Sequence, residues 1–206
     1  MRGVLDTKGV ALAVFFGAVL YFYGGPGYLA LMLVFFVLAV VVTKYEYEVK
    51  KEMGLYEHER GWENVLSNGL LPAALTVASP LIGPMPFIAS LAAVTADKFG
   101  SEIGVLDPGD PRSIFGFAPV KPGTSGGISV MGTVGSFAGS AAIAAAAMAV
   151  FGINPAQGLV VAVAGLAGSV ADTMFGVLEE RGIGTKGTTN FICSLVGALI
   201  GYYLIG

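Results

Sequence analysis

The sequence predicts an all-α fold, a polytopic bundle of membrane helices, and three observations lead to this prediction. The chain has 206 residues, of which 55% are hydrophobic and only 12% are charged, about half the charged share of a typical soluble domain. Its mean hydropathy is +0.78, and its apolar residues come in runs that approach the ~17–25 residues needed for a helix to cross a bilayer. Between these runs, long charged connections alternate with short uncharged ones.

Seven apolar segments account for the expected transmembrane helices. In chain order they cover approximately residues 4–23, 28–43, 65–83, 86–99, 128–151, 157–175 and 190–205. The uncharged part of the first segment starts near Gly9, after Arg2 and Lys8, as in a signal peptide, but Gly-Gly-Pro-Gly and a second apolar segment come next instead of a small-residue cleavage site. We therefore interpret it as a retained first helix and expect residues 1–206 to form one integral membrane domain.

The connections between the segments predict the orientation of the chain in the membrane. The short connections contain no charged residue and cover 24–27, 83–86 and 152–157. The long connections cover 44–64, 98–127 and 176–189. Together with the N-terminus, Asp97 and Asp172, the long connections hold all 11 Lys and Arg and all 14 Asp and Glu residues. Because Lys and Arg favour the cytoplasmic side, we expect a multi-pass protein of the cell membrane with its N-terminus, its long loops and any active site at the cytoplasmic face.

The second half of the chain resembles an internal repeat. The segment Leu91–Asp97 is similar to Leu166–Asp172, and after each come a glycine, an acid and a Gly-Thr-x-Gly sequence that opens the next apolar segment. Both halves run in the same direction across the membrane, so the simplest account is a parallel duplication that covers 86–151 and 157–205. The alternative is a chance likeness among helices rich in glycine and alanine.

Other features of the sequence have structural interpretations. The chain holds 31 glycines, and small residues at four-residue spacing, such as Gly132, Ser136 and Ser140, predict close helix packing in lipid. The mixed charges of residues 44–59 are typical of a solvated helix face. Trp62 is suited to anchor a helix at the membrane interface.

Composition excludes several classes of function. The net charge of −3 and the lack of a basic patch interleaved with aromatic residues argue against a nucleic-acid partner. Cys193 is the only cysteine, so neither an intrachain disulfide framework nor a cysteine-based metal site is expected. His58 lies in a charged run and nothing pairs it with a nucleophile, so a hydrolase triad has no support.

Carboxylates that end two apolar segments predict the chemistry of the charged face. An ionisable residue in a membrane helix costs ~2.5–3.5 kcal/mol at the helix centre and by default indicates a functional site. Asp172 shares a helix face with Glu179, and Asp97 shares one with Ser101, which Glu102 joins only if the helix breaks. Carboxylates from two helices suit Mg²⁺, which takes one or two of them plus substrate phosphates. Alternatively, these acids are solvated by headgroups or paired with neighbouring basic residues.

The segment 120–127, Val-Lys-Pro-Gly-Thr-Ser-Gly-Gly, predicts a phosphate-binding loop. Its glycines allow positive φ and leave backbone N–H groups uncovered, and the positive end of the following helix points at it. Lys121 adds a cation, and Thr124 and Ser125 add hydroxyls, so the segment has what an anion nest needs. It is not a P-loop, because its lysine precedes the glycines. The alternative is an ordinary glycine-rich turn into a helix.

A second glycine pattern lies near the C-terminus. Gly182-x-Gly184-x-x-Gly187 matches a dinucleotide fingerprint by letters only, because no strand precedes it. As the repeat partner of the first loop it offers Lys186, together with the hydroxyls that follow it, as phosphate contacts.

These segments together resemble one family, over nearly the whole chain from Leu5-Asp6 onward. The residues that carry the resemblance are Arg60-Gly61-Trp62 to Asn68-Gly69, Ala96-Asp97, Ser101-Glu102-Ile103-Gly104, Pro111-Arg112, the segment 120–127, Gly168-Ser169, Asp172, Gly176 and Asn190. The chain resembles the membrane family that includes the plant phytyl-phosphate kinase of vitamin E synthesis and the animal transmembrane protein nineteen. More distantly, it is similar to CTP-dependent membrane kinases of dolichol and phytol and to the CDP-diacylglycerol synthases.

The resemblance implies transfer of a phosphoryl group from a nucleoside triphosphate, with CTP the expected donor, to a prenyl monophosphate such as phytyl or geranylgeranyl phosphate. In this interpretation the metal ligands for Mg²⁺ are Asp97, Glu102 and Asp172, which with Lys121 form the catalytic set. The nucleotide phosphates would bind Lys121, Gly123, Thr124, Ser125, Gly126, Gly127 and Lys186. The acceptor phosphate or the base would bind Arg60, Asn68, Ser101 and Asn190.

The chain departs from the family pattern at two places. Asp97-Lys98 stands where relatives have Asp-Thr, and Thr188-Thr189-Asn190 stands where relatives often have paired Asn, and both changes bear on metal or nucleotide binding. Two alternative functions remain open, a cytidylyltransferase that makes a CDP-activated lipid and a transporter of a phosphorylated lipid or small anion. Against transport, the face opposite the long loops carries no charge. The expected partners are a membrane lipid or prenyl phosphate, a nucleoside triphosphate and further copies of the chain in a homo-oligomer.

Overall fold

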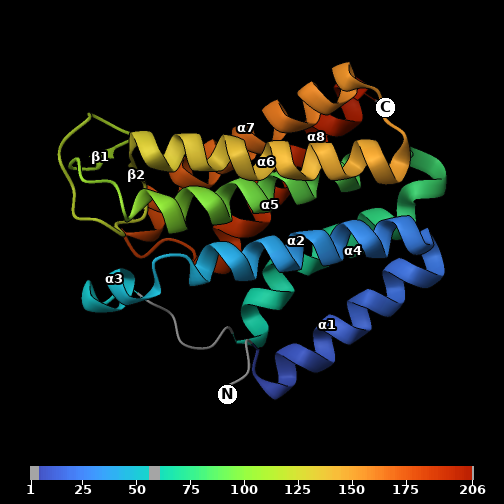
Figure 1. Ribbon diagram of the computed structural model, residues 1–206, viewed down its shortest axis with the longest axis horizontal. Coiled ribbons are helices and arrows are strands. Elements are labelled where there is room, and N and C mark those ends of the chain that lie inside the picture. Colours follow the sequence, from blue (N-terminus) through green and yellow to red (C-terminus); the bar gives the residue numbers. More distant parts are fainter. Residues whose placement is uncertain (1–4, 56–60, 206) are drawn as a thin grey trace.

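The computed structural model describes residues 5–55 and 61–205, and these residues form the helical bundle that the sequence predicts. Figure 1 shows the long helices lying side by side, with a short helix and a small pair of strands at one end. The helices are α1 (Thr7–Val19) with the π-helix η1 (Leu20–Gly24), α2 (Pro26–Lys44), α3 (Tyr47–Glu52), α4 (Trp62–Ile82), α5 (Met85–Gly104), α6 (Val130–Phe151), α7 (Pro155–Glu179) and α8 (Lys186–Ile205). Strands β1 (Arg112–Ser113) and β2 (Gly127–Ile128) pair antiparallel.

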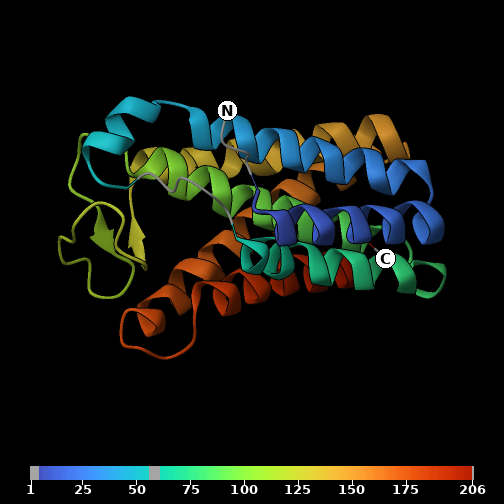
Figure 2. The ribbon, with the colours of Figure 1, turned by 90° about the horizontal axis from the view of Figure 1, so that it is seen from below.

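The three short connections lie together at one end of the bundle, and glycine and proline explain why the chain turns there. Gly25, Gly83 and Gly152 have φ values of 85°, 72° and 67°, a conformation that commonly ends a helix and that glycine adopts most readily. A proline then begins or precedes the next helix in each case. The long connections lie at the opposite end, which we call the loop end, while the C-terminus lies with the short connections (Figures 1 and 2).

Within the described ranges, six helices are long and apolar enough to cross a membrane, so the chain has the character of a polytopic membrane protein. The predicted segment 86–99 corresponds to α5, which is not among the six and which continues to Gly104. All residues from Met85 to Ala96 are buried, because α2, α4, α6, α7 and α8 pack around this helix. The connection after α5 is therefore shorter than the predicted loop 98–127.

Small residues let the helices around α5 approach closely, as the sequence predicts. A Cβ atom at Gly132 of α6 would lie 3.1 Å from the carbonyl oxygen of Gly100 on α5. A Cβ atom at Gly197 of α8 would lie 2.5 Å from the carbonyl oxygen of Ala89, also on α5. Any larger side chain at these glycines would push the helices apart. The contact at Gly132 holds the loop-end half of α6 against α5, near the predicted site residues, and the contact at Gly197 holds the other half of α8 against α5.

Candidate functional site

Two predicted site carboxylates meet at the loop end. Asp97 lies two turns before the end of α5, and Asp172 lies two turns before the end of α7. Their carboxyl groups interact electrostatically with each other, and both interact with the ammonium of Lys186, the first residue of α8. The Nζ atom of Lys186 lies 3.0 Å from Oδ2 of Asp172. Three helices thus bring three predicted site residues together.

The carboxylate of Asp172 is buried. The residue is 4% exposed, and its Oδ1 atom is buried without a hydrogen-bond partner in the part of the chain that the structure describes. A buried charged oxygen without a partner is costly, so such a group usually binds something. Mg²⁺ takes one or two carboxylates together with phosphate oxygens, and Asp97 and Asp172 fit this requirement. Across residues 5–55 and 61–205, no three Asp, Glu, His or Cys side chains gather to hold a metal, so a cation at Asp97 and Asp172 would need further ligands besides these side chains.

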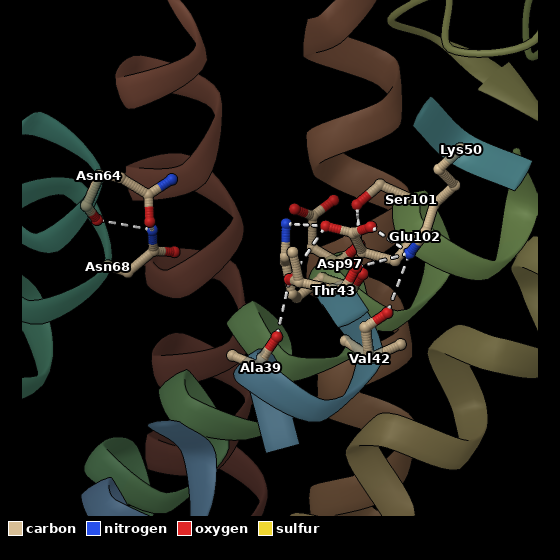
Figure 3. Close-up of polar contacts among 10 residues, drawn as sticks. Ala39, Val42, Thr43, Lys50, Asn64, Asn68, Asp97, Ser101 and Glu102 are labelled. Atoms are coloured by element: carbon tan, nitrogen blue, oxygen red, sulfur yellow. Dashed lines mark hydrogen bonds and ion pairs between the residues drawn. The ribbon is translucent and has the colours of Figure 1, made fainter. Parts of the chain in front are cut away.

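Glu102, the third predicted metal ligand, takes part in a different set of contacts (Figure 3). Its Oε2 atom lies 2.9 Å from Nζ of Lys50 on α3. Its Oε1 atom pairs with Lys98 and accepts a hydrogen bond of 3.1 Å from Oγ1 of Thr43. Two lysines therefore balance the charge of Glu102, and we leave it out of the metal-binding pair.

Lys50 is buried, whereas the sequence predicts a solvated helix face for residues 44–59. Its side chain is 1% exposed, and Nζ donates to the carbonyl oxygens of Val42 at 3.1 Å and Thr43 at 2.9 Å as well as to Glu102 (Figure 3). The last carbonyls of a helix lack partners within the helix and carry the negative end of its dipole. Lys50 satisfies these groups on α2, which explains why a charged side chain is stable there. Residues 56–59 of the same run lie outside the described residues.

The glycine-rich segment 120–127 forms a closed turn at the loop end. The N–H groups of Thr124 and Gly127 bond to carbonyl oxygens of the segment itself, at 3.1 and 3.0 Å. The N–H of Ser125 donates to Oε1 of Glu180, at the end of α7, at 2.9 Å. A carboxylate thus takes one of the backbone donors that the sequence assigns to a phosphate, so a phosphate at Ser125 would have to displace Glu180.

The N-terminus of α6 also has an anionic partner. Oδ2 of Asp107 accepts a hydrogen bond of 2.8 Å from the N–H of Met131, and Oδ1 accepts one of 2.9 Å from Gly109. These bonds hold the pKa of Asp107 below its usual value, with the bond from Met131 the larger cause. Oγ of Ser129 accepts a further bond of 3.1 Å from Gly132. The helix end that the sequence assigns to a ligand of the glycine-rich loop is therefore capped by the protein's own groups.

Two adjoining pockets occupy the loop end. The first, which we call the glycine pocket, has a volume of about 410 Å³ and lies between the segment 120–127, α5, α6 and α7. The second, which we call the asparagine pocket, has a volume of about 400 Å³ and lies between α2, α4, α5 and α8. Residues that line both pockets are Asp97, Ser101, Val105, Gly123 and Lys186. Asp97 and Lys186 therefore lie where the two pockets meet.

Most predicted site residues line one of these pockets. Those at the glycine pocket are Lys121, Gly123, Thr124, Ser125, Gly126, Gly127 and Asp172. Those at the asparagine pocket are Asn68, Glu102 and Asn190. Lys121 has an exposed side chain. Arg60 lies outside the described residues.

Two lining residues are absent from the predicted set of site residues. Asn64 of α4 lies one turn before Asn68, and the backbone carbonyl oxygen of Asn64 accepts a hydrogen bond of 2.8 Å from Nδ2 of Asn68 (Figure 3). The spacing of these two amides on one face of an apolar helix is a signal that the sequence does contain. Glu179 lines the glycine pocket, and its buried Oε2 atom has no partner among the described residues. Its shared face with Asp172 was visible in the sequence, but not its burial.

Gly126 should be the position of the glycine-rich segment that tolerates substitution least. Its φ is +84°, and a Cβ atom there would lie 3.1 Å from the backbone nitrogen of Val177 and 3.3 Å from the carbonyl oxygen of Thr173 on α7. We expect Gly126→Ala to destabilise the protein by about 2 kcal/mol more than Gly116→Ala. Gly116 is the matched control, because it has a φ of +83° and open space around it. Unfolding of both variants in detergent measures the difference, and equal midpoints would show that the segment does not depend on this contact.

Comparison with known proteins places this chain in a family. The family described as integral membrane protein DUF92 matches residues 1–198. An uncharacterized membrane protein of Methanocaldococcus jannaschii is 37% identical over 204 residues, which cover 96% of this chain and 84% of that protein. Protein PGR of Arabidopsis thaliana is 30% identical over 210 residues, covering 85% of this chain and 72% of that protein. No solved structure gives a significant match.

Proposed function

For this chain, which belongs to the DUF92 family of integral membrane proteins, we propose the function of a membrane-bound prenyl-phosphate kinase. It transfers the terminal phosphoryl group of a nucleoside triphosphate, with CTP the expected donor, to an isoprenyl monophosphate such as phytyl or geranylgeranyl phosphate. The product is the corresponding diphosphate. The observation that carries this proposal is the pair of adjoining pockets, with Asp97 and Lys186 lining both of them.

The glycine pocket suits the nucleotide. Its lining offers the hydroxyls of Thr124 and Ser125, the cation of Lys121 and a turn of backbone that includes glycines. Such groups bind phosphate oxygens without selecting a base. The pocket lies among the loops, on the side from which a water-soluble nucleotide would arrive.

The asparagine pocket suits the acceptor. It combines the amides of Asn64, Asn68 and Asn190 with the apolar side chains of Phe35 and Val94. An amphiphilic phosphate needs this combination, because its head requires hydrogen-bond donors while its tail requires apolar surroundings. A soluble acceptor would have no use for the apolar part.

The proposed reaction needs no general base from the protein. The acceptor phosphate is already an anionic nucleophile, so one of its oxygens attacks the γ-phosphorus as the bond to the β–γ bridging oxygen breaks and the nucleoside diphosphate leaves. Phosphoryl transfer of this kind depends on positioning and charge neutralisation. Lys186 lines both pockets, so its ammonium can contact donor and acceptor phosphates together. Asp97 and Asp172 would hold Mg²⁺, which would neutralise charge on the phosphates.

The topology follows from the same proposal. The hydropathy of α5 is too low for this helix to count among the candidate membrane spans, because its neighbours enclose it and it needs little apolar surface toward lipid. We propose that α5 is nevertheless a seventh crossing. The loop end would then be cytoplasmic, in agreement with the concentration of lysine and arginine there. Asp97 and Asp172 each lie two turns before the end of their helices, as partners in a parallel repeat of 86–151 and 157–205 would.

The decisive test uses purified protein in detergent with geranylgeranyl phosphate and CTP labelled in the γ-phosphate. We expect labelled geranylgeranyl diphosphate, formed only when Mg²⁺ is present. A lipid that carries the cytidyl group, with release of pyrophosphate, would indicate the cytidylyltransferase instead. Flux of the phosphate across liposomes without nucleotide would indicate the transporter.

Removal of Glu180 should improve nucleotide binding. The carboxylate competes with a phosphate for the N–H of Ser125 and repels it, so Glu180→Ala should lower the KM for the nucleotide about fivefold, on the scale of an exposed charge interaction of ~1 kcal/mol. Asp110→Ala serves as the control, since this acid is also exposed and lines neither pocket. A higher KM in Glu180→Ala would mean that Glu180 supports the nucleotide site.

A further inference from the structure

The asparagine pocket extends from the charged loop end toward the middle of the bundle. Lys98 and Glu102 lie at its outer part, and Phe35 and Val94 lie at its inner end. Phe35 is nine residues before Lys44, the last residue of α2. At 1.5 Å per residue, this places Phe35 about 13 Å below the end of the helix.

Two helices form the side walls of this pocket. Both α2 and α4 pack against α5, which forms the floor, whereas α2 and α4 make few contacts with each other. At the other end of the bundle, η1 packs against both of them. The walls therefore stay apart at the loop end and are joined beyond the inner end of the pocket.

The polar part of the lining suits a phosphate head. Asn190 is 6% exposed, and its Nδ2 atom makes only a long contact of 3.4 Å with Oγ of Ser67 among the described residues. Asn68 faces the same pocket from α4, and Lys186 faces it from the start of α8. Together they offer two amides and one ammonium to phosphate oxygens.

The inner end has room for one slender chain. Phe35 comes from α2 and Val94, which is 2% exposed, comes from α5, so they close the pocket from two sides. The volume of about 400 Å³ must hold the head as well as the chain. A lipid with two acyl chains would need a second apolar branch away from the loop end, but the other apolar side chains of the lining, Leu55 and Val105, follow α3 and α5 at the loop end.

We infer that Phe35 is a specificity-determining residue, which contacts the tail of a single-chain prenyl phosphate and fixes how much of that tail the asparagine pocket accepts. The inference rests on the proposed function for the identity of the ligand. Beyond that function, the inference states where the prenyl tail binds and which side chain limits its length. A neighbouring residue supplies a matched control, because Phe36 on the same helix is 39% exposed and does not line the pocket.

The test compares Phe35→Trp with Phe36→Trp. Binding of geranylgeranyl phosphate and of the short isopentenyl phosphate is measured in detergent without nucleotide. We expect Phe35→Trp to weaken binding of geranylgeranyl phosphate about tenfold and that of isopentenyl phosphate less than about twofold, because the larger ring fills only the tail end of the pocket. Phe36→Trp should change neither. Equal effects on both ligands, or no effect of Phe35→Trp, would overturn the inference.

A second measurement uses the unchanged protein and does not depend on how the variants fold. Geranylgeranyl phosphate with a photoreactive group on its first isoprene unit should label peptides from α2 and α5 that contain Phe35 and Val94. Labelling that misses the enclosed helix α5 would also overturn the inference, because lipid outside the pocket reaches α2 but not Val94. Labelling at these peptides without any phosphoryl transfer would reject the kinase alone, while transfer with labelling elsewhere would reject the role of Phe35 alone.

Discussion

Asp172→Asn should abolish phosphoryl transfer, with a fall in kcat of at least about 10³-fold. Asparagine has nearly the size of aspartate, so the packing of α7 is preserved. The substitution removes the charge that faces Lys186 at 3.0 Å and replaces one of the two carboxylate oxygens with an amide group, which donates hydrogen bonds and does not bind a cation. With that charge lost, Asp97 alone would hold the cation weakly and the phosphates would lose their alignment.

Rates at increasing Mg²⁺ concentration distinguish this role from a structural ion pair. If Asp172 only balanced Lys186, the Mg²⁺ concentration that gives half-maximal rate would not change in Asp172→Asn, whereas we expect it to rise at least about tenfold. Asp110→Asn is the control, because Asp110 is exposed and lines neither pocket. Full activity in Asp172→Asn or in Asp97→Asn would refute the proposed site.

Lys50→Met should destabilise the protein by about 3 kcal/mol, as expected when one partner of a buried ion pair is removed. The ammonium of Lys50 holds two carbonyl oxygens at the end of α2 and the carboxylate of Glu102 on α5. Methionine fills most of the same space but leaves these acceptors without their donor. The loss should loosen α3 from α2 and α5 first, because the hydrogen bonds of Lys50 join α3 to both helices.

Denaturant unfolding in mild detergent measures this effect, and the neighbouring residue gives the control. Lys51 is exposed, so Lys51→Met should change stability by less than about 0.5 kcal/mol. Combining Lys50→Met with Glu102→Gln should cost less than the sum of the two single changes, because both act on one pair. Similar losses for Lys50→Met and Lys51→Met would contradict the described role of Lys50.

The sequence predicts the helices and the meeting of the acids because both depend on local patterns. Apolar runs, glycine and proline define most helix ends, and the similar surroundings of Asp97 and Asp172 predict equivalent places at one face. The length of α5 was less predictable. A helix needs an apolar composition where it faces lipid. Because α5 is enclosed by other helices, it can carry Asp97, Lys98 and Glu102 near its end.

The finer geometry of the site depends on contacts between distant parts of the chain. The donors of the glycine-rich segment were predictable, but their occupation by Glu180 joins residues 55 positions apart. The capping of α6 by Asp107 joins residues 24 positions apart, and the burial of Lys50 requires α3 to fold back on α2. A charged residue in such a place looks in the sequence like any other surface charge.

The enclosure of α5 also bears on how the chain is inserted during synthesis. As the proposed seventh crossing, α5 has a less apolar composition than its neighbours and presents little surface to lipid. Its insertion into the bilayer from the translocon as a single helix would therefore be less favourable than that of its neighbours. Its binding partners α6, α7 and α8 are made after it. We therefore expect α5 to integrate stably only once the helices that enclose it have been made, and a chain cut short after Gly104 to integrate poorly.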